Sequence, residues 1–341
     1  MSDRLQRLLK HRIAQAGIII LAGIMLVLLC AQQSVKDVNI TVDQVDAHIK
    51  LLSSDSLKGR WSFSEDIRMA EDYIAAQFGS AGLKTFPRFP DYRHEFEYTY
   101  KDRRNPDNPE KTVRLANVIG YLEGTDPQLK DEFIIFGAHH DHIGVRGDAE
   151  DNIYNGAEDN ASGTTAVISL AQYYARAGGN KRSILFVTFT AEEVGMVGSR
   201  QLVKDLPVPK DKIAAMINFE MIGKPSDEGK PVCYLTGWER SDLGSIMQES
   251  LGDDPLQLIE GPEITKRLFF GSDNISFARE GVVAHTLAGI KSTNDPLTHN
   301  PDDEYETLDV QNMIRIIRGV VRASKTLISG ERTPKLIQPV E

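Results

Sequence analysis

Three of the eight histidines of this chain lie within four positions, in the segment GAHHDHIGV at residues 137–145. His139, His140 and His142 surround one carboxylate, Asp141, directly after the apolar run FIIF. Imidazole and carboxylate groups are zinc ligands, so the segment is a candidate metal site at the end of a strand. A single histidine is more often an ordinary surface or hydrogen-bonded side chain. A metal site therefore requires further donors from other parts of the chain.

The composition limits the kind of site that is possible. The 341 residues are 41% hydrophobic and 26% charged, which is enough for one large domain or two ordinary ones. A net charge of −10 argues against nucleic-acid binding, which a basic surface would mark. The two cysteines, Cys30 and Cys233, exclude a disulfide framework and a cysteine-based zinc site. Any metal is expected to be bound by histidine and carboxylate.

The N-terminal segment has the pattern of a membrane anchor or a signal peptide. A basic head, RLQRLLKHR, precedes an apolar stretch, and no charge occurs from Ile13 to Val35. This length suits one membrane crossing, with the head in the cytoplasm and the remainder of the chain outside. Cleavage as a signal peptide and lipidation of Cys30 are alternatives, but LCAQQ fits both processing signals poorly, so we expect an uncleaved anchor. The expected division is residues 1–36 for the head and anchor, 37–331 for a single catalytic domain, and 332–341 for a polar tail.

Beyond the anchor, segments with helical spacing alternate with apolar segments typical of buried strands. Near-continuous apolar strands that alternate with helices indicate an α/β fold, with a mostly parallel central sheet and helices on both faces. The predicted strands are residues 114–124, 132–138, 182–191, 212–223 and 280–289, and the predicted helices are residues 41–60, 64–84, 161–178, 191–206 and 309–329.

Donor side chains follow several of these strands. In open α/β sheets, ligand sites form beyond the carboxyl ends of the strands. His139 follows one strand, Glu192 and Glu193 follow the next, and Glu220 ends the third. Asp159 lies immediately before a helix and so belongs to the same edge of the sheet. The sequence therefore predicts that these donors meet at one site.

Five motifs, in their order and spacing, resemble the co-catalytic zinc exopeptidases of metallopeptidase family 28. They are GAHHDH, GAEDNASG, AEEVGMVGS, NFEMIG and THNPDDEYETLD. LSSDSLKGR, YIAAQFGSAGL and NVIGYLEG extend the resemblance, so that it runs from about residue 45 to residue 325. The resemblance implies the zinc exopeptidase fold, which is phosphorylase/hydrolase-like, and a site that binds two zinc ions.

The roles of individual residues follow from this resemblance. Asp159 matches the carboxylate that bridges two zinc ions, Asp141 matches the carboxylate that orients the first histidine ligand, and Glu192 matches the general base. His140 and His142 match positions that are not ligands. The implied metal ligands are His139, Asp159, Glu193, Glu220 and His299.

Glu220 departs from the family pattern, which usually has Asp at this position. The longer side chain changes the reach of the ligand and leaves open whether one or both of its oxygens bind metal. It also keeps a one-zinc site possible, as in the related glutaminyl cyclases.

The resemblance implies a dizinc aminopeptidase that acts on peptides, and the N-terminal segment implies that this enzyme is exported. Three alternatives stay open: a carboxypeptidase, for which Lys266 and Arg267 would supply the basic pocket, a glutaminyl-cyclase-like enzyme, and a catalytically silent binding domain. The segments 232–238 and 267–277 are candidates for pocket walls and equally for core.

Overall fold

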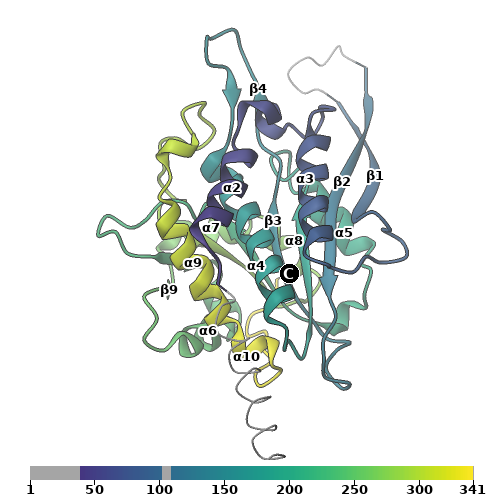
Figure 1. Cartoon of the computed structure of the whole chain (residues 1–341), viewed down its shortest axis with the longest axis vertical. Coiled ribbons are helices and arrows are strands. Elements are labelled where there is room, and N and C mark those ends of the chain that lie inside the picture. The colour runs from purple at the N-terminus through teal and green to yellow at the C-terminus, as the bar shows by residue number, and fades with distance from the viewer. Residues whose placement is uncertain (1–38, 102–108, 341) are drawn as a thin grey trace, which may run out of the picture. The chain divides into compact units, whose positions relative to one another are not determined.

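The computed structural model describes residues 39–101 and 109–340. From Ile40 onwards the chain forms one compact unit around an eight-stranded sheet of order β1-β2-β6-β3-β7-β10-β8-β9 (Figure 1). A separate small hairpin pairs β4 with β5. The strands are β1 Arg93–Tyr100, β2 Lys111–Leu122, β3 Phe133–His139, β4 Gly144–Val145, β5 Ile153–Tyr154, β6 Ser183–Phe189, β7 Ile213–Glu220, β8 Val232–Leu235, β9 Gln257–Ile259 and β10 Ala284–Gly289.

The four strands at the centre of the sheet, β6, β3, β7 and β10, run parallel to one another. On one side, β2 is antiparallel to β6, and β1 is antiparallel to β2. On the other side, β8 is antiparallel to β10. The predicted α/β class is confirmed, but the sheet is mixed. Residues 101–110, which join β1 to β2, are too few for the crossover that parallel pairing needs.

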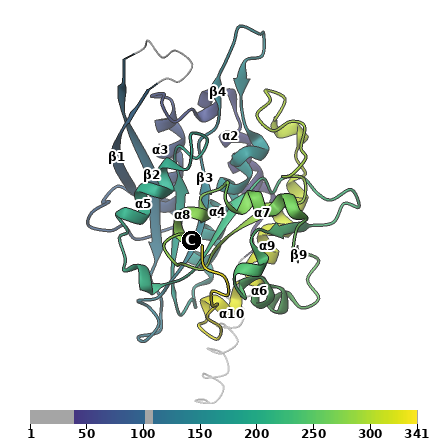
Figure 2. The same cartoon turned by 180° about the vertical axis from the view of Figure 1, so that it is seen from behind.

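Helices cover both faces of the sheet. One face carries α2, α3, α4 and α9 (Figure 1), and the opposite face carries α5 and α8 (Figure 2). The helices are α2 Val42–Leu52, α3 Ile67–Ser80, α4 Gly163–Ala177, α5 Val197–Lys204, α6 Leu243–Leu251, α7 Glu263–Phe269, α8 Asn274–Ala278, α9 Val310–Ala323 and α10 Lys325–Ile328.

The apolar sequence of β3 is explained by its position at the centre of a sheet that is covered on both faces. Successive side chains of a strand point to opposite faces of the sheet. Ile134 and Phe136 belong to the core beneath α2, α3, α4 and α9, whereas Phe133 and Ile135 pack in the second core, which includes Phe277 of α8. Both faces are covered, so the strand has no polar face, and it delivers His139 to the edge of a rigid sheet.

Several predicted helices have different boundaries in the structure. The closing helix expected over residues 309–329 is divided at Ser324 into α9 and α10. The helix expected over residues 191–206 begins only at Val197, because Gly195 and Met196 have φ of +105° and +57°, outside the helical region. The helix expected over residues 41–60 ends at Leu52, before a short 3-10 segment.

The expected anchor at residues 1–36 lies outside the described residues. Within residues 39–101 and 109–340, no helix is long and apolar enough to span a bilayer. The expected polar tail is bonded to the rest of the unit. The guanidinium of Arg182 donates to the carbonyl oxygen of Arg332, and the backbone N–H of Ile337 donates to that of Arg240.

Candidate metal centre

Two of the expected ligands are neighbours at the carboxyl edge of the sheet. Gly137 of β3 pairs with Asn218 of β7, so His139 and Glu220, each two residues further along its strand, end side by side. Nε2 of His139 lies 3.1 Å from Oε1 of Glu220.

Asp159 lies between two imidazoles. It belongs to the turn Ala157–Ser162, which leads into α4. Its Oδ1 is 3.4 Å from Nε2 of His139, and its Oδ2 is 3.3 Å from Nε2 of His299. The two oxygens of one carboxylate therefore face two different histidines.

Glu193 completes the second group of donors. Its Oε2 is 3.0 Å from Nε2 of His299, a half-exposed side chain in the loop after β10. Ligand atoms of a tetrahedral zinc site with bonds of about 2.0–2.1 Å lie about 3.3 Å apart. The distances at the sheet edge, 3.0 to 3.4 Å, match that spacing. The geometry thus groups His139 with Glu220 and His299 with Glu193, which motif order alone left open.

The electrostatics of the site favour cations. Burial alone would lower the pKa of His139, but Glu220 and the other carboxylates around it outweigh burial and hold the pKa well above its ordinary value. Hydrogen bonds to Asp159 and Glu193 raise the pKa of His299 to about 10. The surrounding carboxylates therefore stabilise the protonated, positively charged form of each imidazole. A bound metal ion would provide the positive charge in place of the proton.

Asp141 connects the first histidine to the loop that carries Glu192 and Glu193. Nδ1 of His139 donates to the main-chain oxygen of Asp141 at 3.1 Å, and the Asp141 carboxylate lies 3.6 Å from the same nitrogen. That carboxylate accepts the backbone N–H groups of Glu192 and Glu193 at 3.1 and 3.4 Å. The expected orienting carboxylate therefore also fixes the loop of the expected base.

Glu192 lies next to Glu193 in this loop. Burial raises the pKa of its carboxyl group well above the ordinary value, and the negative charges of Asp273 and Glu220 add to the effect. A carboxylate with a raised pKa is a stronger proton acceptor than an exposed glutamate.

The other two histidines of the cluster differ in what they contact. Nδ1 of His140 lies 3.1 Å from Oγ1 of Thr188 on β6, and not in either donor group. Nδ1 of His142 lies 2.8 Å from Oε1 of Glu193 and 3.8 Å from Oδ2 of Asp159. His142, Asp159 and Glu193 are also close enough together to hold a metal ion. The sequence placed His142 in the cluster but gave no sign of its contact with Glu193.

A buried arginine ties together the loops of the site. Arg60, which ends the LSSDSLKGR motif, is 1% exposed. Its Nε donates to the carbonyl oxygen of His140 at 2.8 Å, and its Nη2 donates to that of Gly156 at 2.9 Å. Arg60 thus connects the loop after β3 to the turn that carries Asp159.

Asp303 holds the bridging residue from the other side. Its carboxylate accepts the backbone N–H groups of Glu158 at 3.0 Å and of Asp159 at 3.1 Å. Asp303 lies in the motif THNPDD, in which the sequence predicted a role for His299 alone.

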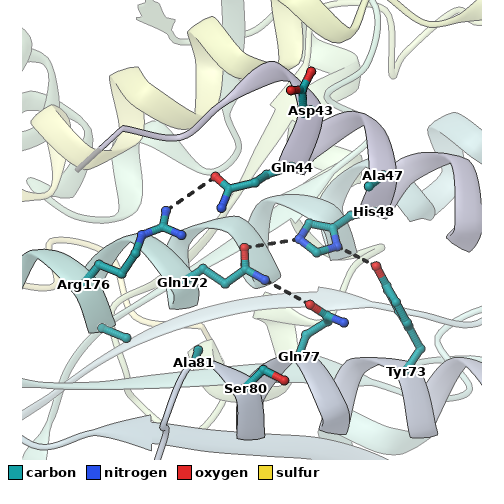
Figure 3. A pocket seen from close by; sticks show the side chains of 11 residues that line it. Asp43, Gln44, Ala47, His48, Tyr73, Gln77, Ser80, Ala81, Gln172 and Arg176 are labelled. Carbon is teal, nitrogen blue, oxygen red and sulfur yellow. Dashed lines mark hydrogen bonds between the residues drawn. The ribbon is translucent and has the colours of Figure 1, made fainter. Parts of the chain in front are cut away.

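A hollow of about 580 Å³ lies elsewhere, among α2, α3 and α4 (Figure 3). Its polar side chains bond to one another: His48 to Tyr73 at 2.6 Å and to Gln172 at 3.3 Å, and Gln172 to Gln77 at 3.0 Å. Gln172 lies in the C-terminal half of α4, whereas Asp159 precedes the start of that helix. This hollow is therefore separate from the donor groups at the sheet edge.

Comparison with known proteins shows which family has this combination of fold and motifs. The model of Peptidase family M28 matches residues 117–324, more than half of the chain. The chain belongs to peptidase family M28. The resemblance predicted from the five motifs is thereby confirmed.

Individual relatives of this M28 peptidase are distant. Aminopeptidase YwaD of Bacillus subtilis (strain 168) is 28% identical over 233 residues, which cover 65% of this chain and 47% of that protein. A probable zinc metalloprotease of Pyrenophora teres f. teres (strain 0-1) is 27% identical over 202 residues, which cover 55% of this chain and 40% of that protein. The chain thus spans less than half the length of these two relatives.

The fold recurs in a solved structure. The aminopeptidase from Aneurinibacillus sp. strain AM-1 superposes with a TM-score of 0.64 at 15% identity, over 89% of this chain and 96% of that one. The family match therefore agrees with the presence of two groups of side chains at the sheet edge that could each hold a metal ion.

Proposed function

We propose that this M28 peptidase removes single residues from the N-terminus of peptides, with two zinc ions bound at the edge of the sheet. The observation that carries the proposal is the position of Asp159, whose two oxygens face different imidazoles at 3.4 and 3.3 Å. One carboxylate between two histidine–carboxylate pairs is the arrangement that a two-metal hydrolase needs.

The donors fit zinc, which accepts histidine and carboxylate ligands. His139, Glu220 and Oδ1 of Asp159 would hold one ion, and His299, Glu193 and Oδ2 of Asp159 would hold the other. Three protein ligands leave a coordination position open for water or substrate. Zinc bound in this way supplies an activated water and offsets the negative charge that builds on the scissile carbonyl group.

Glu192 is the proposed general base. It would take a proton from the attacking water onto its carboxylate and return it to the departing amine, a contribution typically worth about 10²–10⁴ in rate. Its backbone N–H is fixed by the Asp141 carboxylate, and its neighbour Glu193 is a ligand, so the base keeps a constant position relative to the metals.

The charge of the site favours the N-terminus of the substrate. A positively charged α-amine would be attracted by the carboxylates gathered at the sheet edge, among them Asp159, Glu193 and Glu220. A carboxypeptidase needs a cation for the substrate carboxylate, yet Lys266 is exposed on α7 and pairs with Glu263 at 2.7 Å, and Arg267 is exposed beside it. The two separate donor groups favour a two-metal enzyme over a one-zinc cyclase, and the complete set of base and ligands favours catalysis over silent binding.

The substrate end is tested with three peptides of one sequence. We expect release of the first residue from the unmodified and C-terminally amidated peptides, and none from the N-acetylated peptide. Equal rates on the free and acetylated peptides would contradict aminopeptidase action. Ring closure of an N-terminal glutamine without hydrolysis would support the cyclase alternative.

We further infer that the catalytic domain is exported and stays anchored by its N-terminal segment. The support is the basic head followed by the uncharged stretch from Ile13 to Val35. Protease added to intact spheroplasts should digest the domain, and the protein should fractionate with membranes. Protection of the domain in spheroplasts would reverse the orientation, and a mature N-terminus beyond Ala31 would show cleavage.

A further inference from the structure

The two carboxylate oxygens of Glu220 have different partners. Oε1 faces the metal site, 3.1 Å from Nε2 of His139. Oε2 accepts a hydrogen bond of 2.7 Å from the hydroxyl group of Ser272, in the loop between α7 and α8. Ser272 is 4% exposed, so water does not compete strongly for this hydroxyl group. The partner of Oε2 is thus part of the protein.

The Ser272 hydroxyl group is itself oriented. It accepts a hydrogen bond of 2.9 Å from Nδ2 of Asn218, which precedes Glu220 by two residues on β7 and so lies on the same face of the strand. A serine hydroxyl has one proton to donate. Because the Asn218 amide occupies a lone pair of the oxygen, the proton is directed to Glu220.

We propose that Ser272 is a positioning residue that holds Glu220 as a ligand through one oxygen only. This inference rests on the proposed function, in which Glu220 and His139 share one zinc ion. The hydrogen bond keeps Oε2 away from the metal and presents Oε1 to it. The length of the glutamate side chain would allow coordination through one oxygen or through both. The hydrogen bond from Ser272 restricts Glu220 to coordination through Oε1.

The length of Glu220 is needed for this arrangement. A glutamate extends one methylene further than an aspartate, and at this strand end it spans from Ser272 on one side to His139 on the other. An aspartate at position 220 would have to give up one of these contacts unless the end of β7 moved. The serine and the longer carboxylate therefore act as a pair.

The effect of Ser272 is confined to one of the two ions. Its hydroxyl group contacts Glu220, whereas the second group of donors, Glu193 and His299, is held by other contacts. Loss of the hydroxyl group should therefore weaken one ion and leave the other unchanged. Partners of this kind, which orient a metal ligand, typically change metal affinity about 10–100-fold.

The test is a graded chelation series on zinc-loaded protein, with zinc per chain as the readout. Ser272→Ala should lose one ion at about 10–100-fold lower chelator strength than wild type and keep the other at wild-type strength. Ser276→Ala is the matched control, because Ser276 is also 4% exposed and bonds to another serine, Ser199, at 2.9 Å. Ser272→Thr, which keeps the hydroxyl group, should restore the wild-type profile.

A double variant shows whether Ser272 acts through Glu220. In a Glu220→Ala background, which removes the ligand, Ser272→Ala should not change the affinity for the remaining ion. The proposal is overturned if Ser272→Ala loses its zinc like wild type. It is also overturned if both ions weaken equally, or if the double variant shows additive losses. A wild-type chain that binds no zinc would instead contradict the proposed function itself.

Discussion

Nδ1 of His142 lies 2.8 Å from Oε1 of Glu193, while Oε2 of the same carboxylate faces His299 at 3.0 Å. Nδ1 of His142 is 3.8 Å from Oδ2 of Asp159, whereas Nε2 of His299 is 3.3 Å from that oxygen, which is the spacing expected between two ligands of one tetrahedral zinc ion. We therefore interpret His142 as a donor that holds Glu193, and His299 as the imidazole ligand of that ion.

Variants of the two histidines test this interpretation. His142→Ala should still bind two zinc ions at saturation, with one of them about 10–100-fold weaker, because Glu193 loses its donor. His299→Ala should lose one zinc per chain. His48→Ala, a buried histidine in the hollow of Figure 3, serves as the control and should bind zinc like wild type. Outright loss of one zinc in His142→Ala, with both retained in His299→Ala, would make His142 the ligand.

The general base is tested by Glu192→Gln. The amide keeps the shape of the side chain but cannot accept a proton, so turnover should fall about 10²–10⁴-fold while zinc content stays at the wild-type value. Glu193→Gln is the paired variant and should lose zinc as well as activity. If Glu192→Gln retains activity within a few-fold of wild type, another group is the base.

Asp303 should control the bridging ligand through the backbone. Its carboxylate accepts the N–H groups of Glu158 and Asp159, so Asp303→Ala should loosen Asp159 and weaken both zinc ions together. The adjacent Asp302→Ala, at an exposed position, should bind both ions like wild type. Graded chelation of the two variants provides the measurement. A wild-type chelation profile in Asp303→Ala would show that Asp159 does not depend on Asp303, and weakening of a single ion would contradict an effect through the bridging ligand.

The stability of the metal-free protein should depend on His285. Burial lowers the pKa of His285 to about 4, and Nδ1 donates to the carbonyl oxygen of Thr236 at 2.7 Å. The unfolded chain takes up this proton at higher pH than the folded protein does. The contribution is therefore complete above the ordinary pKa of about 6.5 and decreases as the pH falls towards 4, by about 3 kcal/mol in all.

His285→Asn keeps a donor for Thr236 but removes this titration. Its free energy of unfolding in urea should therefore fall less steeply from pH 7 to pH 4.5 than that of wild type. Parallel curves for the two proteins would show that His285 does not contribute to the pH dependence.

Much of the site could be predicted from the sequence because strands of one direction end at one edge of a sheet. The apolar runs placed His139, Glu220 and the Glu192–Glu193 pair at that edge, and the structure brings them together with Asp159 and His299. The segment AEEV looked like a helix start, since carboxylates favour the first turn. Instead, the N–H groups of Glu192 and Glu193 bond to the carboxylate of Asp141, which lies in the loop after β3, and no local pattern reveals such a partner.

The residues that hold the ligands could not be found in this way. Ser272 and Asp303 lie in loops, where a serine or an aspartate is ordinary and no periodicity marks its direction. Their roles depend on contacts with Glu220 and Asp159, which are distant in the sequence. The Asp-to-Glu departure at position 220 was visible, but its partner was not.

The central claim is tested most directly by a zinc titration of the metal-free protein. The release of the N-terminal residue of a peptide is measured at each step of the titration. Asp159 faces two donor groups, so activity should reach its maximum at two zinc ions per chain, and the N-acetylated peptide should stay intact throughout. Full activity at one zinc per chain, or no hydrolysis of the free peptide at two, would contradict the two-metal aminopeptidase.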